Sequence, residues 1–435
     1  MMSRPMSTTT SPTPSTTPRS SASREALEQL RARGFVQQIT DEAALAARLA
    51  GGPVTFYAGF DPTAASLHVG SCIPLMAMAH LARAGHRAIA VLGGGTAMVG
   101  DPSGKTEMRQ LISADAIATN RAAIEPQVRQ IIGPGAVVVD NGEWLLSLNY
   151  IAFLRDIGRH FSVNRMLAAE AYKMRLEKGL SFIEFNYQLL QAYDFLKLNE
   201  QYDCALQIGG DDQWGNIIAG VDLTRRVRQK EVFGLTFPLL TTATGAKMGK
   251  TAAGAVWLSA AMTTPFDFFQ YFVNVDDRDV VKFLKLLTFE PLDEIARFEA
   301  VAGAELRDAK RLLARAVTAI VHGDAAAAAA DAQARAAFGG GGGGPGGEAA
   351  ADLPTSPLDP ARVAAGLKIV DVIAEAGLAP SKSAARRLIE QGGVRVGPRK
   401  ITSVDDVVVA GEIDAGGTLL HVGKKHIRRL IVGEG

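Results

Sequence analysis

The chain has 435 residues, too many for one compact core, so its length predicts two or three domains. Its 46 lysines and arginines nearly balance 45 acids, so the net charge identifies no partner and any nucleic-acid surface must be local. The two cysteines, Cys72 and Cys204, exclude a disulfide framework and a zinc site built on cysteine, and they fit a reducing cytoplasm.

Residues 1–24 are predicted to form a disordered tail. The first 23 residues include 17 Ser, Thr or Pro, two Arg and no acid, a composition that cannot pack into a core. A transit peptide can share this composition, but the segment lacks an amphipathic apolar face, so a cytoplasmic tail is favoured. No apolar run approaches the roughly 20 residues that a membrane span needs, so we expect no membrane contact.

Residues 25–258 alternate short apolar runs with helical patterns such as 73–85. The predicted buried strands, which run up to glycine or a polar turn, are 53–60, 86–95, 136–141 and 204–210. Buried strands that alternate with helices are typical of a parallel α/β sheet, whose ligands collect at the carboxyl ends of the strands.

Beyond this region the strand signal fades, and 259–337 carries apolar residues at helical spacing, which predicts an α-helical domain. Residues 338–360, rich in Gly and Pro, are predicted to be a flexible linker. Residues 361–435 then form a small separate α+β unit with a local basic patch. Across 376–400, Glu390 is the single acid against six cations, which are Lys382, Arg386, Arg387, Arg395, Arg399 and Lys400.

The stretch YAGFDPTAASLHVGS (57–71) runs from a strand through Asp-Pro-Thr into a helix that we expect to begin near His68. A helix amino terminus favours a phosphate, and Gly70 would let a bound group approach the backbone. His68 and Ser71 share one helix face. An ordinary turn with a capping Asp and a surface His is an equally good interpretation of this stretch alone.

The glycine-rich turn at 92–109 nearly matches two nucleotide-binding motifs. Walker A fails because residue 99 is valine, and the Rossmann spacing fails because residue 98 is methionine. The remaining loop bears Asp101, Lys105 and Arg109, which could pair with an ammonium and with phosphate. A solvated loop is the alternative.

Two further segments carry polar residues in apolar surroundings. In 185–198, Tyr187, Gln191 and Asp194 project from one helix face, which indicates either a polar cavity or a solvent-facing stripe. In 206–216, a strand ends in two glycines and paired acids, followed by Gln213. These acids suit ribose hydroxyls or an amino group, although turn propensity explains part of the pattern.

The sequence KMGKT (247–251) places two lysines on a short loop, a pattern that is usually only solvated. Taken together and in their order along the chain, however, these five segments resemble bacterial tyrosyl-tRNA synthetases of class I. HVGS is similar to their His-x-Gly-His signature, KMGKT to their Lys-Met-Ser-Lys-Ser loop, and GDPSGK, LLQAYDF and IGGDDQWGN to tyrosine-specific versions. The resemblance covers about 25–435, and 361–435 resembles an S4-type RNA-binding domain.

The resemblance implies a Rossmann-like catalytic domain, an anticodon-binding helical domain, and roles for individual residues. Tyr57 and Asp194 would bind the tyrosine phenol. The ammonium would be held by Asp101, Tyr187 and Gln191, with Gln213 near the carboxylate. ATP would be contacted by Gly59, Asp61, Thr63, His68, Gly70, Asp212, Lys247, Lys250 and Thr251, with help from Lys105 and Arg109.

The implied substrates are L-tyrosine, ATP with its accompanying Mg²⁺, and tRNA(Tyr), in a cytoplasmic homodimer that has no tightly bound cofactor and no protein metal site. Lys382, Arg386 and Arg387 would contact tRNA. Ser71, Gly249 and Thr251 depart from the signatures. A tryptophan-activating enzyme, an RNA-binding protein with an inert nucleotide fold, and a P-loop NTPase are the alternatives.

Overall fold

The computed structural model describes residues 21–103, 112–177, 179–243, 245, 248–251, 254–338, 353–379, 381–414, 416–423 and 426–433. Its first part is a six-stranded sheet in the order β1-β6-β5-β2-β3-β4. These strands are β1 (Gln38–Ile39), β2 (Thr55–Phe60), β3 (Arg87–Leu92), β4 (Val137–Asp140), β5 (Cys204–Gly210) and β6 (Phe233–Phe237). All neighbours pair in parallel except β1, which pairs antiparallel with β6.

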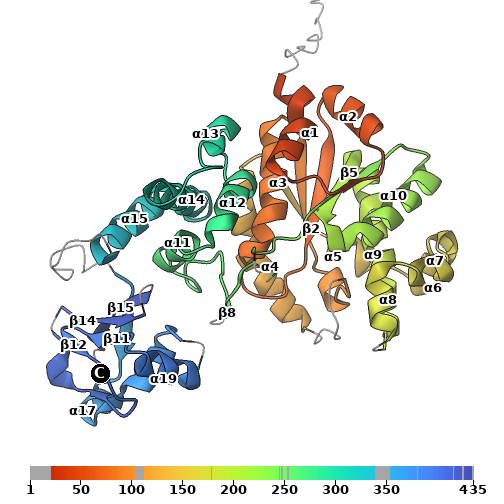
Figure 1. Cartoon of the computed structure of the whole chain (residues 1–435). Helices are drawn as coiled ribbons and strands as arrows, with labels where there is room; N and C mark the ends of the chain where they lie inside the picture. The colour runs from red at the N-terminus through yellow and green to blue at the C-terminus, as the bar shows by residue number, and fades with distance from the viewer. Residues whose placement is uncertain are drawn as a thin grey trace, which may run out of the picture.

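Helices cover both faces of this sheet (Figure 1). They are α1 (Ser21–Arg33), α2 (Glu42–Ala50), α3 (Cys72–Arg83), α4 (Ala114–Ile132), α5 (Gly142–Leu145), α6 (Tyr150–Asp156), α7 (Val163–Leu167), α8 (Glu170–Leu176), α9 (Phe182–Tyr202) and α10 (Trp214–Arg228). Successive strand residues point to opposite faces. Phe56 and Ala58 accordingly join the core that contains α3, whereas Tyr57 joins the core beneath α9 and α10.

The helical part consists of α11 (Pro265–Val273), α12 (Val280–Leu287), α13 (Leu292–Ala296), α14 (Ala304–His322) and α15 (Asp324–Phe338). Its apolar faces do not form a core of their own. Phe268, Phe283 and Leu313 belong to the same buried cluster as Phe56 of the sheet. The predicted domains 25–258 and 259–337 therefore share one hydrophobic core.

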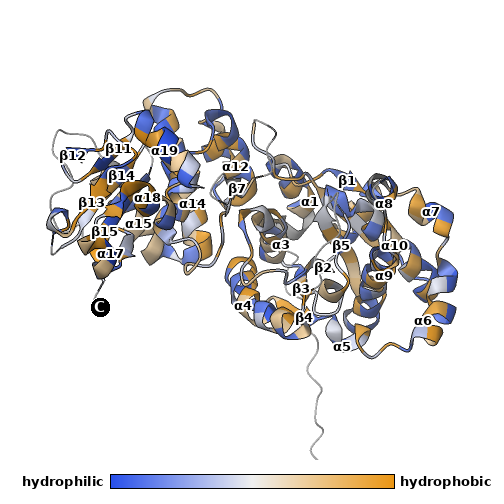
Figure 2. Ribbon diagram, turned by 90° about the horizontal axis from the view of Figure 1, so that it is seen from below, coloured by the Kyte–Doolittle hydropathy of each residue, from blue (hydrophilic) through white to orange (hydrophobic). Residues whose placement is uncertain are grey.

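The terminal unit, residues 353–433, has a separate core and a five-stranded sheet in the order β12-β11-β14-β15-β9. Its elements are β9 (Thr355–Leu358), α17 (Pro360–Ala364), β10 (Leu367–Lys368), α18 (Ile369–Glu375), α19 (Lys382–Glu390), β11 (Val394–Val396), β12 (Arg399–Lys400), β13 (Val407–Val408), β14 (Thr418–Val422) and β15 (His426–Val432). In Figure 2 the ribbon of this unit includes apolar residues, coloured orange, along its strands. It contacts the helical part through Phe266, Leu353 and Ile427, and through Arg428, which donates to both carboxylate oxygens of Asp267 at 2.8 and 2.6 Å.

Two segment boundaries and one strand differ from the sequence-based expectation. The helix α1 already begins at Ser21, within the segment predicted to be a tail, and most of that tail lies outside the described residues. The predicted linker ends too late, because β9 within it pairs in parallel with β15. The strand β6 was not predicted. Its Gly234 lies so close to α10 that an added Cβ would overlap Ile217.

No helix in the described part of the chain is both long and apolar enough to cross a membrane.

Candidate active site

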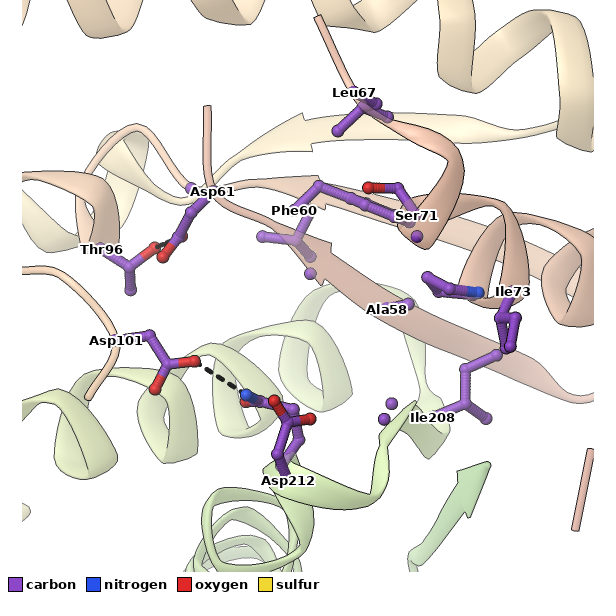
Figure 3. A pocket seen from close by; sticks show the side chains of 18 of the residues that line it. Ala58, Phe60, Asp61, Leu67, Ser71, Ile73, Thr96, Asp101, Ile208 and Asp212 are labelled. Atoms are coloured by element: carbon purple, nitrogen blue, oxygen red, sulfur yellow. Dashed lines mark hydrogen bonds between the residues drawn. The ribbon is translucent and has the colours of Figure 1, made fainter. Parts of the chain in front are cut away.

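A cleft of about 380 Å³ opens at the carboxyl ends of β2 and β5, where the chain order of the sheet reverses. Figure 3 shows Asp61, Thr96, Asp101 and Asp212 around it. The predicted site residues that line the cleft are Tyr57, Gly59, Asp61, Thr63, His68, Gly70, Asp101, Tyr187, Gln191, Asp194, Asp212 and Gln213. Tertiary structure thus brings together residues from four separate sequence segments.

One end of the cleft is formed by Tyr57 and Asp194, both almost fully buried. The Tyr57 hydroxyl makes no hydrogen bond to any described residue. Both oxygens of Asp194 are occupied: Oδ1 accepts from Trp144 Nε1 at 2.7 Å and Oδ2 from Asn141 Nδ2 at 2.9 Å. A ligand hydroxyl at this end of the cleft could accept a hydrogen bond from the Tyr57 hydroxyl and donate one to the Asp194 carboxylate.

Burial is the main cause that raises the pKa of Asp194 to about 7, although the hydrogen bonds from Asn141 and Trp144 oppose the rise. Burial likewise raises the pKa of Tyr57 well above its usual value, so its hydroxyl stays protonated. At neutral pH the carboxyl group of Asp194 is thus close to its titration midpoint.

The helix α9 carries Tyr187, Gln191 and Asp194 toward the cleft. It begins with a capping box in which the Ser181 hydroxyl and the Glu184 carboxylate accept from each other's backbone N–H groups. Tyr187 and Asp194 are buried, so the solvent-facing stripe considered for this helix is excluded. The cap orients the first turn, and helical spacing then aligns the three side chains.

Carboxylates cluster in the middle of the cleft. Asp101 accepts from the Ser103 N–H at 2.9 Å and from Gln213 Nε2 at 2.8 Å, and Asp61 accepts from the Tyr187 hydroxyl at 3.1 Å. Among the described residues that line the cleft there is no lysine or arginine. Such a group of carboxylates favours an ammonium ligand.

The paired acids that follow β5 have different environments. Asp211 accepts from Gln38 Nε2 at 2.6 Å and from the Thr236 hydroxyl at 3.0 Å, so it ties β1 and β6 to the end of β5. Asp212 lines the cleft. The pattern of two adjacent acids therefore combines a structural residue with a candidate ligand-binding residue.

At the other end of the cleft, His68 caps the short helix η1 (Val69–Ser71), which leads into α3. Its Nδ1 accepts from the Gly70 N–H at 2.9 Å, which places the ring proton on Nε2. A Cβ at residue 70 would lie 2.6 Å from His68 Cε1. Glycine at residue 70 thus leaves room for the His68 ring where it lies, and the close approach of a ligand at this residue stays a prediction.

The two signature motifs touch each other. Val69 donates to the Val256 carbonyl at 2.9 Å, and Val256 donates to the Gly249 carbonyl at 2.9 Å. Gly249 has φ +83°, and a Cβ there would lie 3.2 Å from Gly70 N, so this departure from the signature suits the backbone. The segment leads into the short hairpin of β7 (Lys250–Thr251) and β8 (Gly254–Ala255).

Several predicted cations cannot be placed. Lys105, Arg109 and Lys247 lie outside the described residues, and Lys250 and Thr251 are described by their backbone only. Their predicted contacts with phosphate stay predictions.

Sequence reasoning missed three buried side chains that support the cleft, namely Thr96, Asn141 and Trp144. Asn141 directly follows β4, so its place at the carboxyl end of a strand was a usable signal. For Trp144 and Thr96 the local sequence contains no comparable signal.

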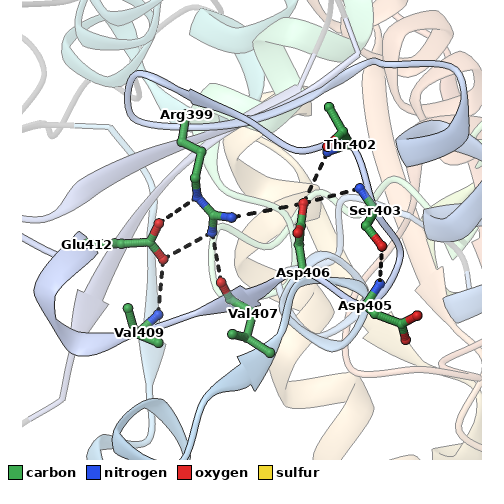
Figure 4. A network of polar contacts seen from close by, with 8 residues as sticks. All are labelled: Arg399, Thr402, Ser403, Asp405, Asp406, Val407, Val409 and Glu412. Carbon is green, nitrogen blue, oxygen red and sulfur yellow. Dashed lines mark hydrogen bonds and ion pairs between the residues drawn. The ribbon is translucent and has the colours of Figure 1, made fainter.

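The basic patch of the terminal unit is smaller than predicted. Lys382 is paired with Asp371 at 2.9 Å. Arg399 is held by Glu412 at 2.6 Å and by the Val407 carbonyl at 2.8 Å (Figure 4). Arg386 and Arg387 on α19 are exposed and form no ion pair with described residues, so they are the better candidates for contacts with phosphate.

Comparisons with known proteins agree with this geometry. Residues 49–339 match the family of class I tRNA synthetases (W and Y), and residues 367–414 match the S4 domain. The chain is 50% identical to the tyrosine–tRNA ligase of Desulfosudis oleivorans over 426 residues, and 48% identical to that of Acetivibrio thermocellus over 406. Each match covers 93% of this chain and 98% of the relative.

Among solved structures, a truncated mitochondrial tyrosyl-tRNA synthetase of Aspergillus nidulans is similar, with a TM-score of 0.65 and 30% identity over 72% of this chain and 94% of that one. A tryptophanyl-tRNA synthetase of Encephalitozoon cuniculi, 14% identical over 72% of this chain and 92% of that one with a TM-score of 0.54, shares the fold. The chain is similar to these relatives over nearly its full length, and its cleft lies at the switch point of the sheet. It therefore belongs to the tyrosine–tRNA ligase family of class I tRNA synthetases.

Proposed function

We propose that the protein activates L-tyrosine with ATP and then transfers the tyrosyl group to the 3′ end of tRNA(Tyr), a proposal supported by its relatives, which are named tyrosine–tRNA ligases. The observation that carries this specificity is the buried hydroxyl of Tyr57, which has no hydrogen-bond partner among the described residues, together with the buried carboxyl of Asp194. A substrate phenol would donate to Asp194 and accept from Tyr57. A tryptophan indole offers no group that can do both.

In the first step, the tyrosine carboxylate attacks the α-phosphorus of ATP, and pyrophosphate leaves with its Mg²⁺. No side-chain nucleophile is needed, so the protein contributes positioning and charge stabilisation. Asp101, Tyr187 and Gln191 are proposed to orient the substrate ammonium. His68, through its Nε2 proton, and the lysines at 247 and 250 are proposed to stabilise the charge that builds on the pyrophosphate.

Tyrosine-dependent ATP–pyrophosphate exchange by the purified protein tests the first step. We expect exchange with tyrosine and little with phenylalanine or tryptophan. Exchange with tryptophan alone would refute the specificity, and no exchange with any amino acid would refute the enzymatic function.

In the second step, the 3′-terminal adenosine of tRNA takes the tyrosyl group, and we propose that α19 of the terminal unit contacts the tRNA backbone. Translation in the cytoplasm is where such a product is used, and we propose that compartment for the protein.

Replacing Arg386 and Arg387 together by alanine is expected to weaken tRNA binding, because two charges that release counterions from the RNA are lost. The KM for tRNA should rise about tenfold at moderate salt, and the salt dependence of binding should become less steep. Tyrosine activation should stay unchanged. Arg362→Ala in the same unit is the control, since Arg362 is paired with Glu375. An unchanged KM for the double variant would rule out this face as a tRNA contact.

We also propose a homodimer. Large apolar side chains are exposed near α6 to α9, with Phe182 70%, Ile151 69% and Leu146 66% exposed. These helices lie together on one side of the molecule in Figures 1 and 2. Monomeric proteins rarely expose so much apolar surface in one region, so a second copy of the chain is a suitable cover.

The variant Ile151→Glu/Phe182→Glu is expected to sediment as a monomer at micromolar concentration, because two charges would be buried without partners in the interface. Sedimentation velocity measures this. Val407→Glu, which alters a partly exposed apolar residue of the terminal unit, should leave the wild-type mass unchanged. A wild-type protein that already sediments as a monomer contradicts the proposal.

A further inference from the structure

A line of hydrogen bonds crosses the floor of the cleft and joins its two functional ends. The Tyr187 hydroxyl donates to Asp61 Oδ2 at 3.1 Å, and the Thr96 hydroxyl donates to Asp61 Oδ1 at 2.8 Å. Asn141 Nδ2 donates to Thr96 Oγ1 and to Asp194 Oδ2, both at 2.9 Å. Thr96 thus lies between the carboxylate proposed for the ATP side and the one proposed for the phenol.

The direction of each bond is determined by its neighbours. Asn141 Oδ1 accepts from the N–H groups of Gly95 at 2.8 Å and Thr96 at 3.4 Å, so the amide nitrogen must face the other two partners. The Thr96 hydroxyl accepts from this nitrogen and therefore donates to Asp61. Thr96 and Asn141 are 2% and 1% exposed, so their hydrogen bonds are largely shielded from bulk solvent.

The turn after β3 is rich in glycine although it fits no standard nucleotide motif, because side chains there would overlap neighbouring hydrogen-bonded residues. A Cβ at Gly93 would overlap both Asp61 Oδ1 and Thr96 Oγ1. A Cβ at Gly94 would overlap Asp140, which accepts from the N–H of Gly142 at 2.8 Å. The glycines make room for the hydrogen bonds of this turn and need no phosphate to account for them.

We propose that Thr96 is a positioning residue, whose hydroxyl holds Asp61 and, through Asn141, Asp194 in the orientations that tyrosine activation and phenol recognition require. This inference rests on the proposed function for its kinetic consequences. Its structural content, one hydroxyl that supports both ends of the cleft, does not depend on that function.

The variant Thr96→Val keeps the side-chain shape but removes the donor that Thr96 supplies to Asp61 Oδ1 and one of the two acceptors of Asn141 Nδ2. One hydrogen bond to a charged group corresponds to about a tenfold effect, so we expect kcat/KM for tyrosine activation to fall tenfold or more. The preference for tyrosine over phenylalanine should fall as well. Thr96→Ser retains the hydroxyl and should restore both quantities to within a few-fold of the wild type.

Thr224→Val is the matched control. Thr224 is fully buried on α10, and its hydroxyl has no hydrogen-bond partner among the described residues. Thr224→Val therefore makes the same exchange of hydroxyl for methyl as Thr96→Val, but outside the hydrogen-bond network of the cleft. This control should leave exchange and selectivity unchanged.

A readout that does not use activity completes the test. The chain has three tryptophans, so the indole N–H resonance of Trp144 can be assigned by NMR with Trp→Phe variants. Thr96→Val should shift this resonance through Asn141 and Asp194, whereas Thr224→Val should not. No shift, or a shift that Thr96→Ser does not reverse, overturns the proposal. Reduced activity with unchanged tyrosine preference also overturns it. Absence of exchange in the wild type overturns the proposed function, and the resonance then still decides the role of Thr96.

Discussion

Replacing Asp194 by alanine is expected to lower tyrosine-dependent exchange by about a hundredfold or more. The substrate phenol would lose its acceptor, and the buried N–H groups of Asn141 and Trp144 would lose theirs. Each unpaired buried group costs about 1–3 kcal/mol, so a total near 3 kcal/mol corresponds to roughly two orders of magnitude in rate. Exchange at saturating ATP, with tyrosine or phenylalanine as the variable substrate, measures the effect.

Asp194→Asn separates chemistry from packing. It keeps the volume of the side chain but has no charge, and one of its two terminal atoms is a donor that would face a donor of Asn141 or Trp144. We expect its selectivity for tyrosine to fall nearly as far as that of the alanine variant, while its thermal stability falls less. Tyrosine-activating enzymes are themselves the standard example of rejecting an analogue that lacks a hydroxyl. An alanine variant with the wild-type preference for tyrosine over phenylalanine would remove Asp194 from the site.

The pH dependence of the wild type follows from the same residue. Burial raises the pKa of Asp194 to about 7, and its ionised form is the stronger acceptor for the single O–H group of the phenol. We therefore expect kcat/KM for tyrosine to rise between pH 6 and 8 and to level off above. Asp194→Asn should lack this rise, because residue 194 no longer titrates. A wild-type profile that is flat over this range would contradict the assignment.

The second large effect is expected on stability, from the ion pair between Arg175 on α8 and Glu184 on α9. Both side chains are 4% exposed, and Arg175 Nη2 lies 3.1 and 3.0 Å from the two carboxylate oxygens. The Ser181 hydroxyl donates to the same carboxylate at 2.7 Å. Glu184→Ala removes the carboxylate of this buried ion pair, and loss of one member of such a pair typically costs about 3–5 kcal/mol in the free energy of unfolding.

Urea denaturation followed by circular dichroism measures this loss. The exposed pair of Arg129 and Glu125, at 2.8 Å, is the control, and Glu125→Ala should cost no more than about 0.5 kcal/mol. Replacing both members of the buried pair, as Arg175→Met/Glu184→Leu, should recover part of the stability, since no buried charge remains. A free energy for Glu184→Ala within about 1 kcal/mol of the wild type would contradict the prediction.

Acid should act on the same pair. Burial alone would raise the pKa of Glu184, but hydrogen bonds from Ser181 and Arg175 outweigh it and bring the pKa below the usual value. The stabilisation is therefore present above the ordinary carboxyl pKa of about 4.3 and is lost as the pH falls below it. Because the capping box of α9 uses Glu184, this loss also loosens the first turn of the helix that carries Tyr187.

Local patterns in the sequence predict the elements that position the site. The strand predicted at 204–210 agrees with Cys204–Gly210, because a continuous apolar run that ends in two glycines is typical of a strand buried on both faces. The helix that contains Tyr187, Gln191 and Asp194 follows from its apolar spacing. For the same reason, the sequence places all three side chains on one face without any tertiary information.

Other features depend on contacts between distant segments and have no local signal. The strand β6 is five residues long and contains Gly234, which is explained only by its close packing against Ile217. The antiparallel strand β1 consists of two residues and is defined by its pairing with β6. A pattern that short cannot be distinguished from a loop.

By itself, the sequence determined which residue types line the cleft and in which order they occur, because short-range periodicity and turn chemistry place them at strand and helix ends. Tertiary structure alone decided how they are supported. It placed Thr96 and Asn141 between Asp61 and Asp194. It also gave Asp211 a hydrogen bond to Gln38 of β1 and Lys382 an ion pair with Asp371. The physical reason is that a buried polar group must find partners wherever the fold places them, and those partners lie far away along the chain.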